Sequence, residues 1–253
     1  MRLENRLKSK MRLFLIKYFV LTVVFLQGQD FRKDIFSVSN YMNRLEKYSY
    51  GLKYYLYVDL NLKVPHDTRT VFIKKDKFNF YMQQPAAFEL IENENEHLKV
   101  DHLNKLMLYA KINHSNPEPI DEVSDPKEFL KMFDQDYDSL SKIISKVSMK
   151  HQNSDYIIYM VEFTDGIYTK MLMTINTKRN LLSSVTVFYR NKRPLDKEDK
   201  KVHAICLKVD YIEFSTDPVF NKETFSTSRF IVKNKNGDIV LKPELKDYQL
   251  QIL

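Results

Sequence analysis

The sequence predicts a mainly β (α+β) fold, in which two helices cover the concave apolar face of a large curved antiparallel sheet. Three observations lead to this fold class. Apolar residues recur at every second position over many short segments, as they do on strands with one buried face. Two segments instead show three- and four-residue spacing, which is typical of amphipathic helices. Turn residues separate the short segments at close intervals, as in an antiparallel meander.

The first 28 residues are basic and then apolar, which is typical of an export signal. They carry a net charge of +5, which leaves only +2 of the chain's +7 for the remainder. The apolar run 18–26 is shorter than the roughly 20 residues of a membrane-spanning helix. We therefore expect a periplasmic protein whose signal peptide, residues 1–28, is cleaved after Gly28 or Gln29; an uncleaved anchor is the alternative. The nearly neutral remainder argues against nucleic-acid binding.

The first half begins with a predicted helix over residues 31–47, whose apolar stripe includes Phe31, Ile35 and Val38. Gly51 is expected to help end this helix. Alternation of apolar and polar side chains then predicts a run of short strands. The predicted strands of this half are residues 52–60, 69–75, 77–84, 87–92, 96–102 and 105–112.

The stretch FNFYMQQPAAFELI, Phe78 to Ile91, shows this alternation clearly. Its apolar residues stand mainly at even positions, while polar residues such as Asn79 and Glu89 stand at odd positions. Because successive side chains on a strand point to opposite faces, the pattern predicts one apolar face and one wetter face. The apolar face is expected to lie toward the two helices and to be only partly covered by them.

The second half starts with a polar segment that contains three prolines, residues 113–126, and is predicted to be a loop. Helical spacing then predicts a second helix over residues 127–148, with Pro126 suited to its first turn. A charged loop is expected at 191–201. The predicted strands of this half are residues 155–163, 166–175, 182–190, 203–214 and 229–233, the last joined to 239–242 by the hairpin turn NKNGD.

The stretch FNFYMQQPAAFELI…LKVDHLNKLMLYAKI and the later LLSSVTVFY and KVDYIEF…DPVFNKETFS resemble the outer-membrane lipoprotein carrier (LolA-like) family. The resemblance includes the proline-containing turn, the segment from Asp101 to Tyr109, and Asn221 with Phe225. It implies a half-barrel domain over residues 29–253, with a helical lid over a hydrophobic cavity, and a periplasmic carrier of acylated lipoproteins. The sequence departs from the family where Leu-Met-Leu replaces an aromatic residue before Tyr109, and in its greater length.

A cavity of this kind would bind acyl chains through apolar side chains on the strands, and methionine suits such a lining because it repacks easily. The alternative is that the same side chains form a filled core. We expect the partner to be a lipid or an acylated lipoprotein, with an envelope protein bound by an adaptor module as the alternative, and the chain to be a monomer. The predicted cavity residues are Leu56, Phe80, Met82, Phe88, Leu90, Leu106, Leu108, Met160, Met171 and Met173.

Catalytic and metal-binding motifs are not apparent in the sequence. The four glycines form no phosphate-binding loop, and no G-x-S-x-G or HExxH motif occurs. His97 and Asp101 share a strand face but lack further convergent ligands. Cys206, the only cysteine, is expected to be a buried apolar residue. We therefore expect no catalytic residues, no metal, no cofactor and no enzymatic activity, with a carboxylate pair distant in sequence as the open alternative.

Overall fold

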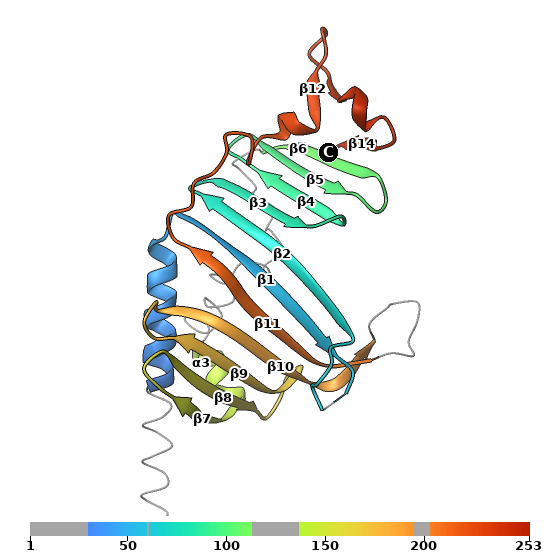
Figure 1. The fold of residues 1–253 in the computed structure, drawn as a ribbon. Coiled ribbons are helices and arrows are strands. Elements are labelled where there is room, and N and C mark those ends of the chain that lie inside the picture. Colours follow the sequence, from blue (N-terminus) through green and yellow to red (C-terminus); the bar gives the residue numbers. More distant parts are fainter. Residues whose placement is uncertain (1–29, 60, 113–136, 195–202) are drawn as a thin grey trace, which may run out of the picture. The chain divides into compact units, whose positions relative to one another are not determined.

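The computed structural model describes residues 30–59, 61–112, 137–194 and 203–253 (Figure 1). The predicted signal peptide and the predicted loop 113–126 lie outside these residues. The first helix covers residues 30–44 and α3 covers Tyr137–Ile143. The strands are β1 (Lys47–Tyr57), β2 (Asp67–Asp76), β3 (Asn79–Gln84), β4 (Phe88–Glu92), β5 (Glu96–Asp101), β6 (Leu106–Lys111), β7 (Ile144–Gln152), β8 (Tyr156–Phe163), β9 (Tyr168–Asn176), β10 (Leu181–Pro194), β11 (His203–Ser215), β12 (Ile231–Lys233), β13 (Ile239–Leu241) and β14 (Gln249–Ile252). Two 3-10 helices, η1 (Thr227–Arg229) and η2 (Pro243–Leu245), flank the β12–β13 hairpin.

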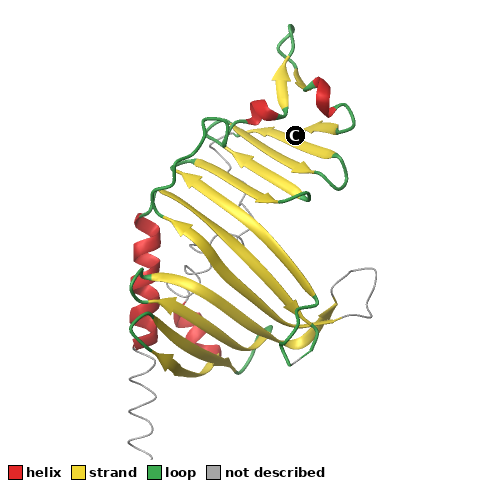
Figure 2. Ribbon diagram, viewed as in Figure 1, coloured by secondary structure: helices red, strands yellow, loops and turns green. Residues whose placement is uncertain are grey.

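The predicted fold class is confirmed: the described chain is mainly β (Figure 2), and the pairing order of its described strands is open, not closed into a barrel. The described strands follow the hydrogen-bonded order β14-β6-β5-β4-β3-β2-β1-β11-β10-β9-β8-β7, and β12 and β13 form a separate hairpin. Strands joined by short turns pair antiparallel, as predicted. Strand β14 instead pairs parallel to β6, an arrangement that the local sequence pattern does not predict.

The chain divides into two compact units. Among the described residues, unit 1 comprises 30–42, 58–59, 137–194 and 203–208. Unit 2 comprises 43–57, 61–112 and 209–253, so β11 contributes residues to both units.

In unit 1 the first helix packs against one face of β8 and β9. The Phe31 ring lies edge-on to the Tyr159 ring at 5.1 Å between centroids, and the Tyr159 hydroxyl donates a hydrogen bond of 2.6 Å to Asp34. Tyr159 is opposite Met173 and Val161 is opposite Met171 in the β8–β9 register, so these four side chains share the face. All four are buried. The prediction of this helix is confirmed except for its last turn, because β1 starts at Lys47.

The predicted second helix, residues 127–148, is wrong over its last part, and its first part, 127–136, lies outside the described residues. The helix α3 ends at Ile143, and Ile144 begins strand β7. Residues of β7 pair with β8, where Ile144 is opposite Phe163 and Val147 is opposite Val161. β-Branched side chains at this spacing fit either structure locally, and here pairing with a neighbouring strand decides the conformation.

Gly51 does not end the first helix but lies inside β1, opposite Phe72. A β-carbon at this position would approach the Cγ1 atom of Ile212 on β11 to 2.8 Å. Glycine is therefore suited to this position by the close approach of a side chain, since no larger residue fits without a shift of Ile212.

Unit 2 has two buried faces, one on each side of its strands. We call them the Phe80 face and the Tyr81 face, after two successive residues of β3. The Phe80 face is formed by Tyr48, Tyr50, Leu52, Val71, Ile73, Phe80, Met82 and Leu90. The Tyr81 face is formed by Tyr81, Ile91, Leu98, Val100, Met107 and Tyr109, together with Phe230 and Ile231. Residues 220–253, which we call the C-terminal segment, therefore supply part of the second cluster.

The prediction that odd-numbered residues between Phe78 and Ile91 form a wetter face is wrong. Tyr81 and Ile91 are buried, and Glu89 is only 7% exposed. Phe78, expected in the apolar row, lies in the β2–β3 turn and is 70% exposed. The reason is that the C-terminal segment covers this face, which a local alternation pattern does not reveal.

Candidate functional site

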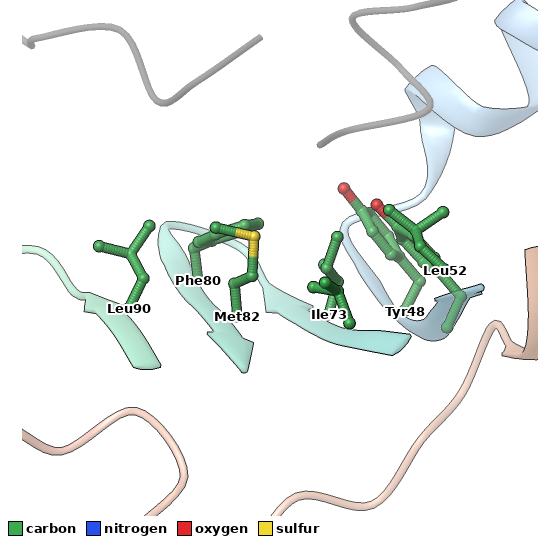
Figure 3. Close-up of a cluster of buried hydrophobic side chains, with 8 residues drawn as sticks. Tyr48, Leu52, Ile73, Phe80, Met82 and Leu90 are labelled. Carbon is green, nitrogen blue, oxygen red and sulfur yellow. The ribbon is translucent and has the colours of Figure 1, made fainter. Parts of the chain in front are cut away.

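The Phe80 face of unit 2 is the candidate functional site. Figure 3 shows six of its side chains pointing to the same side of strands β1 to β4. Partly buried residues packed against this cluster are Leu45, Tyr54, Phe88, Val209, Tyr211 and Phe214. Within the part of the chain that the structure describes, this cluster draws no residue from a helix and none from the C-terminal segment. The two faces of unit 2 therefore differ in what the described chain places on them.

Aromatic rings from two neighbouring strands form one side of this surface. The rings of Tyr48 and Tyr50 on β1 stack at 5.9 Å between centroids, and the ring of Phe214 on β11 stacks on that of Tyr50 at 5.8 Å. The ring of Tyr211 lies 6.2 Å from that of Tyr50. Large aromatic rings that lie flat against one another form a broad apolar surface.

Burial raises the pKa of Tyr54, on the same face of β1, to about 12. The buried side chain favours the neutral, protonated hydroxyl because ionisation would place a charge in apolar surroundings.

Stability should therefore respond to alkaline pH through Tyr54. Its folded-state pKa lies above the ordinary value of 10.0, so the associated stabilisation is present below about pH 10 and is lost as the pH rises through 12. We expect Tyr54→Phe to reduce the loss of unfolding free energy between pH 10 and 12, measured by urea denaturation. An unchanged pH dependence in the variant would contradict this assignment.

The structure brings some of the ten predicted cavity residues together and separates others. Phe80, Met82 and Leu90 belong to the Phe80 cluster, and Phe88 packs against it. Leu56, Leu106 and Leu108 lie on the same face by register but outside the cluster. Strand β5 lies between β4 and β6 and places His97, Lys99 and Asp101 on this face. These polar side chains separate Leu106 and Leu108 from Leu90.

The three predicted methionines of unit 1 lie on two different faces. Met171 and Met173 are buried on the face against which the first helix packs. Met160 is opposite Leu172 in the β8–β9 register, so it points to the other side, where it is half-buried. Cys206, also in unit 1, is buried as predicted, and burial raises the pKa of its thiol to about 11.

A buried polar cluster on the Tyr81 face was not found from the sequence. The Glu89 carboxylate accepts hydrogen bonds from the Tyr81 hydroxyl at 2.9 Å and from the Arg229 guanidinium at 3.0 Å. The Nε2 atom of His102 lies 3.3 Å from the same carboxylate, and its Nδ1 atom lies 2.8 Å from the Tyr248 hydroxyl. These contacts join β3, β4 and the residue after β5 to the C-terminal segment. The only local signal was an acidic residue within an apolar strand.

A second polar contact joins the same elements. The Glu96 carboxylate accepts hydrogen bonds from the Tyr109 hydroxyl, at 3.1 Å, and from the Thr227 hydroxyl of η1. Burial, together with the contact to Glu96, raises the pKa of Tyr109 to about 12. Burial and the Glu89 carboxylate also raise the pKa of Tyr81. The C-terminal segment is thus attached to the Tyr81 face by apolar packing and by two sets of hydrogen bonds.

Among the described residues, no group of three His, Cys, Asp or Glu side chains is arranged to hold a metal ion. The described helices include none that is long and apolar enough to cross a membrane.

Comparison with known proteins identifies similar structures only. No family model matches the chain, and no curated protein sequence matches it. An uncharacterized conserved protein from Thermus thermophilus is similar with a TM-score of 0.43, 8% identity and coverage of 88% of this chain and 99% of that chain. A LolA superfamily protein from Nitrosomonas europaea is similar with a TM-score of 0.29, 9% identity and coverage of 78% and 97%.

A third similar structure is that of the MucA/MucB complex from Pseudomonas aeruginosa, with a TM-score of 0.36, 9% identity and coverage of 75% of this chain and 60% of that chain. All three likenesses are of structure, at low sequence identity.

Proposed function

We propose that this chain is a non-enzymatic binding protein of the cell envelope that holds an acyl chain against the Phe80 face of unit 2. The apolar Phe80 cluster carries this proposal, because partly exposed apolar side chains, among them Tyr54 and Phe88, lie at its border. The Tyr81 face is packed against the C-terminal segment, while the described residues of the Phe80 cluster come from the strands and from Leu45 alone. The residues of the cluster itself are buried, so an acyl chain would bind along this partly exposed border, whose apolar chemistry it matches.

The free energy available from such a contact is large enough for binding. Each buried methylene contributes about 0.8 kcal/mol, so a sixteen-carbon chain gains on the order of 12 kcal/mol if it is fully buried. Partial burial lowers this gain and permits release, which a carrier requires. The unbranched thioether of Met82 in this cluster adjusts to different chain lengths more easily than β-branched residues do.

The cell-envelope location and the lipoprotein cargo are parts of the proposal that rest on the sequence. Residues 1–28 have the basic and then apolar pattern of an export signal. The resemblance to lipoprotein carriers supports an acylated lipoprotein or a free lipid as the ligand. A protein found in the envelope fraction with a new N-terminus after Gly28 or Gln29, read by N-terminal sequencing, would agree with export.

Substitution of two phenylalanines of the same stretch tests whether the acyl chain binds at the Phe80 face. Phe88 packs against the Phe80 cluster, whereas Phe78 lies exposed in the β2–β3 turn. Phe88→Glu should weaken binding of a fluorescent fatty acid to the delipidated protein at least about ten-fold, because it places a charge beside the bound chain. Phe78→Glu makes the same chemical change away from the face and should bind as the unchanged protein does.

Equal affinities of the two variants, each folded by circular dichroism, would place the acyl chain elsewhere. The second arm of the test is the lipid content of protein purified from the envelope, measured by mass spectrometry of an organic extract. A stoichiometric protein partner without any co-purified lipid would support the adaptor function instead.

A further inference from the structure

Strand β14 is paired in a way that differs from its neighbours. Gln249 to Ile252 lie beside Leu106 to Tyr109 of β6 in a parallel register. The backbone N–H of Gln249 donates to the carbonyl of Lys105 at 2.8 Å, and that of Leu253 donates to the carbonyl of Tyr109 at 2.9 Å. The strands of unit 2 from β2 to β6 are joined by short turns that set their register, but no such turn joins β14 to β6.

Few side chains of β14 hold it in place. Leu250 packs against the Tyr81 cluster, while Gln249 and Gln251 are exposed and Ile252 is 59% exposed. The strand is therefore attached mainly by its backbone. The residue before it is attached differently: the Tyr248 hydroxyl contacts His102, and the Lys105 ammonium lies 4.6 Å from the centre of the Tyr248 ring. Release of β14 can thus stop at Tyr248, without loss of the rest of the C-terminal segment.

We propose that the outer edge of β6 is a strand-addition site for an extended segment of a partner protein, and that Gln249–Ile252 occupies this site in its absence. The chain's own segment defines what the edge accepts. The partner segment runs parallel to β6, offers backbone N–H and C=O groups at alternate residues, and places one aliphatic side chain where Leu250 now packs. This inference does not rest on lipid binding, which uses the Phe80 face.

The register identifies the backbone groups that take part. The N–H of Ile112 donates to the carbonyl of Asn95, so even-numbered residues of β6 bond toward β5. The odd-numbered residues Met107 and Tyr109 consequently face β14. On β14, the N–H groups of Gln249 and Leu253 face β6, and by the two-residue period that of Gln251 does too, whereas that of Ile252 points away.

A matched pair of proline substitutions follows from this geometry. Gln251→Pro removes an N–H that bonds to β6 and should release β14 from the edge. Ile252→Pro removes an N–H that points away and serves as the control. Full-length proteins carrying each change are titrated with a fluorescein-labelled peptide, DYQLQIL, the sequence of Asp247–Leu253, and binding is followed by fluorescence anisotropy.

We expect Gln251→Pro to bind this peptide at least about ten-fold more tightly than the unchanged protein and Ile252→Pro do. A second peptide, in which aspartate replaces the residue equivalent to Leu250, should not bind. Hydrogen exchange locates the site: the amides of Met107 and Tyr109 should lose protection in Gln251→Pro and regain it with the peptide, while those of Leu106 and Leu108 stay protected.

Three results would overturn the proposal. The first is a folded Gln251→Pro protein that captures no peptide. The second is equal binding of the two peptides, which would show that the peptide does not bind as a strand with the Leu250 side chain in its place. The third is dimerisation of Gln251→Pro in place of peptide capture, measured by light scattering, which would assign the edge to a second copy of this chain. Peptide capture, its dependence on register and dimerisation are all measured at the β6 edge, whereas the Phe88→Glu test measures fatty-acid binding at the Phe80 face. Either proposal can therefore fail without the other.

Discussion

Replacing Phe31 by alanine should lower the free energy of unfolding by about 3 kcal/mol, because the ring is fully buried and a Phe→Ala change in a core leaves a cavity. The Phe31 ring contacts Tyr159, the residue whose hydroxyl also holds Asp34 of the same helix. The change therefore weakens the attachment of the first helix to β8 and β9. Urea denaturation followed by circular dichroism measures the loss.

The matched control is Phe36→Ala on the same helix. Phe36 is 52% exposed, so its truncation removes less buried area and should cost less than about 1 kcal/mol. Because both substitutions make the same change within one helix, differences in helix propensity nearly cancel between them. Equal losses for the two variants would show that Phe31 does not anchor the helix to the strands of unit 1.

Replacing Arg229 by methionine should lower the free energy of unfolding by about 2 kcal/mol. Removal of one partner of a buried ion pair costs about 3–5 kcal/mol, and the 30% exposure of the Arg229 side chain reduces that cost. Glu89, whose side chain is 10% exposed, would retain contacts with Tyr81 and His102 only. Thermal and urea denaturation both report the change.

An exposed ion pair provides the comparison for Arg229. Arg69 pairs with Asp67 at 2.7 Å, with side chains 63% and 36% exposed, and Arg69→Met should change stability by less than about 1 kcal/mol. The double variant Glu89→Leu, Arg229→Met should recover part of the loss, because no buried charge is then left without its partner. A loss at Arg229 no larger than at Arg69 would contradict the role of the buried cluster.

Much of the fold follows from local pattern. Alternation predicts strands β1 to β6 because each of them has at least one buried side, and Gly237 in the predicted hairpin turn has the left-handed φ of +86° that this turn requires. The failures share one physical cause, which is pairing or packing with residues distant in sequence. Strand β7 forms on β8, the odd side of β3 and β4 is covered by the C-terminal segment, and β14 adds to β6 without a hairpin.

The candidate site was predictable only where one local pattern defines one face. Phe80, Met82 and Leu90 come from a single stretch and do share a cluster. Met160 and Met173 also look equivalent in sequence, but the β8–β9 register puts them on opposite sides. The aromatic surface from Tyr50 and Phe214 requires β1 and β11 to be neighbours, which a reading of one segment at a time does not supply.

Two methionines of unit 2 allow the most direct test of acyl-chain binding. Met82 lies on the Phe80 face and Met107 on the Tyr81 face, and both are buried. With ¹³C-methyl methionine, spin-labelled stearate should broaden the Met82 resonance and leave that of Met107 unchanged, since the label follows the chain to one face. Broadening of Met107 with Met82 unaffected, or broadening of neither at saturating ligand, would contradict the binding of an acyl chain on the Phe80 face.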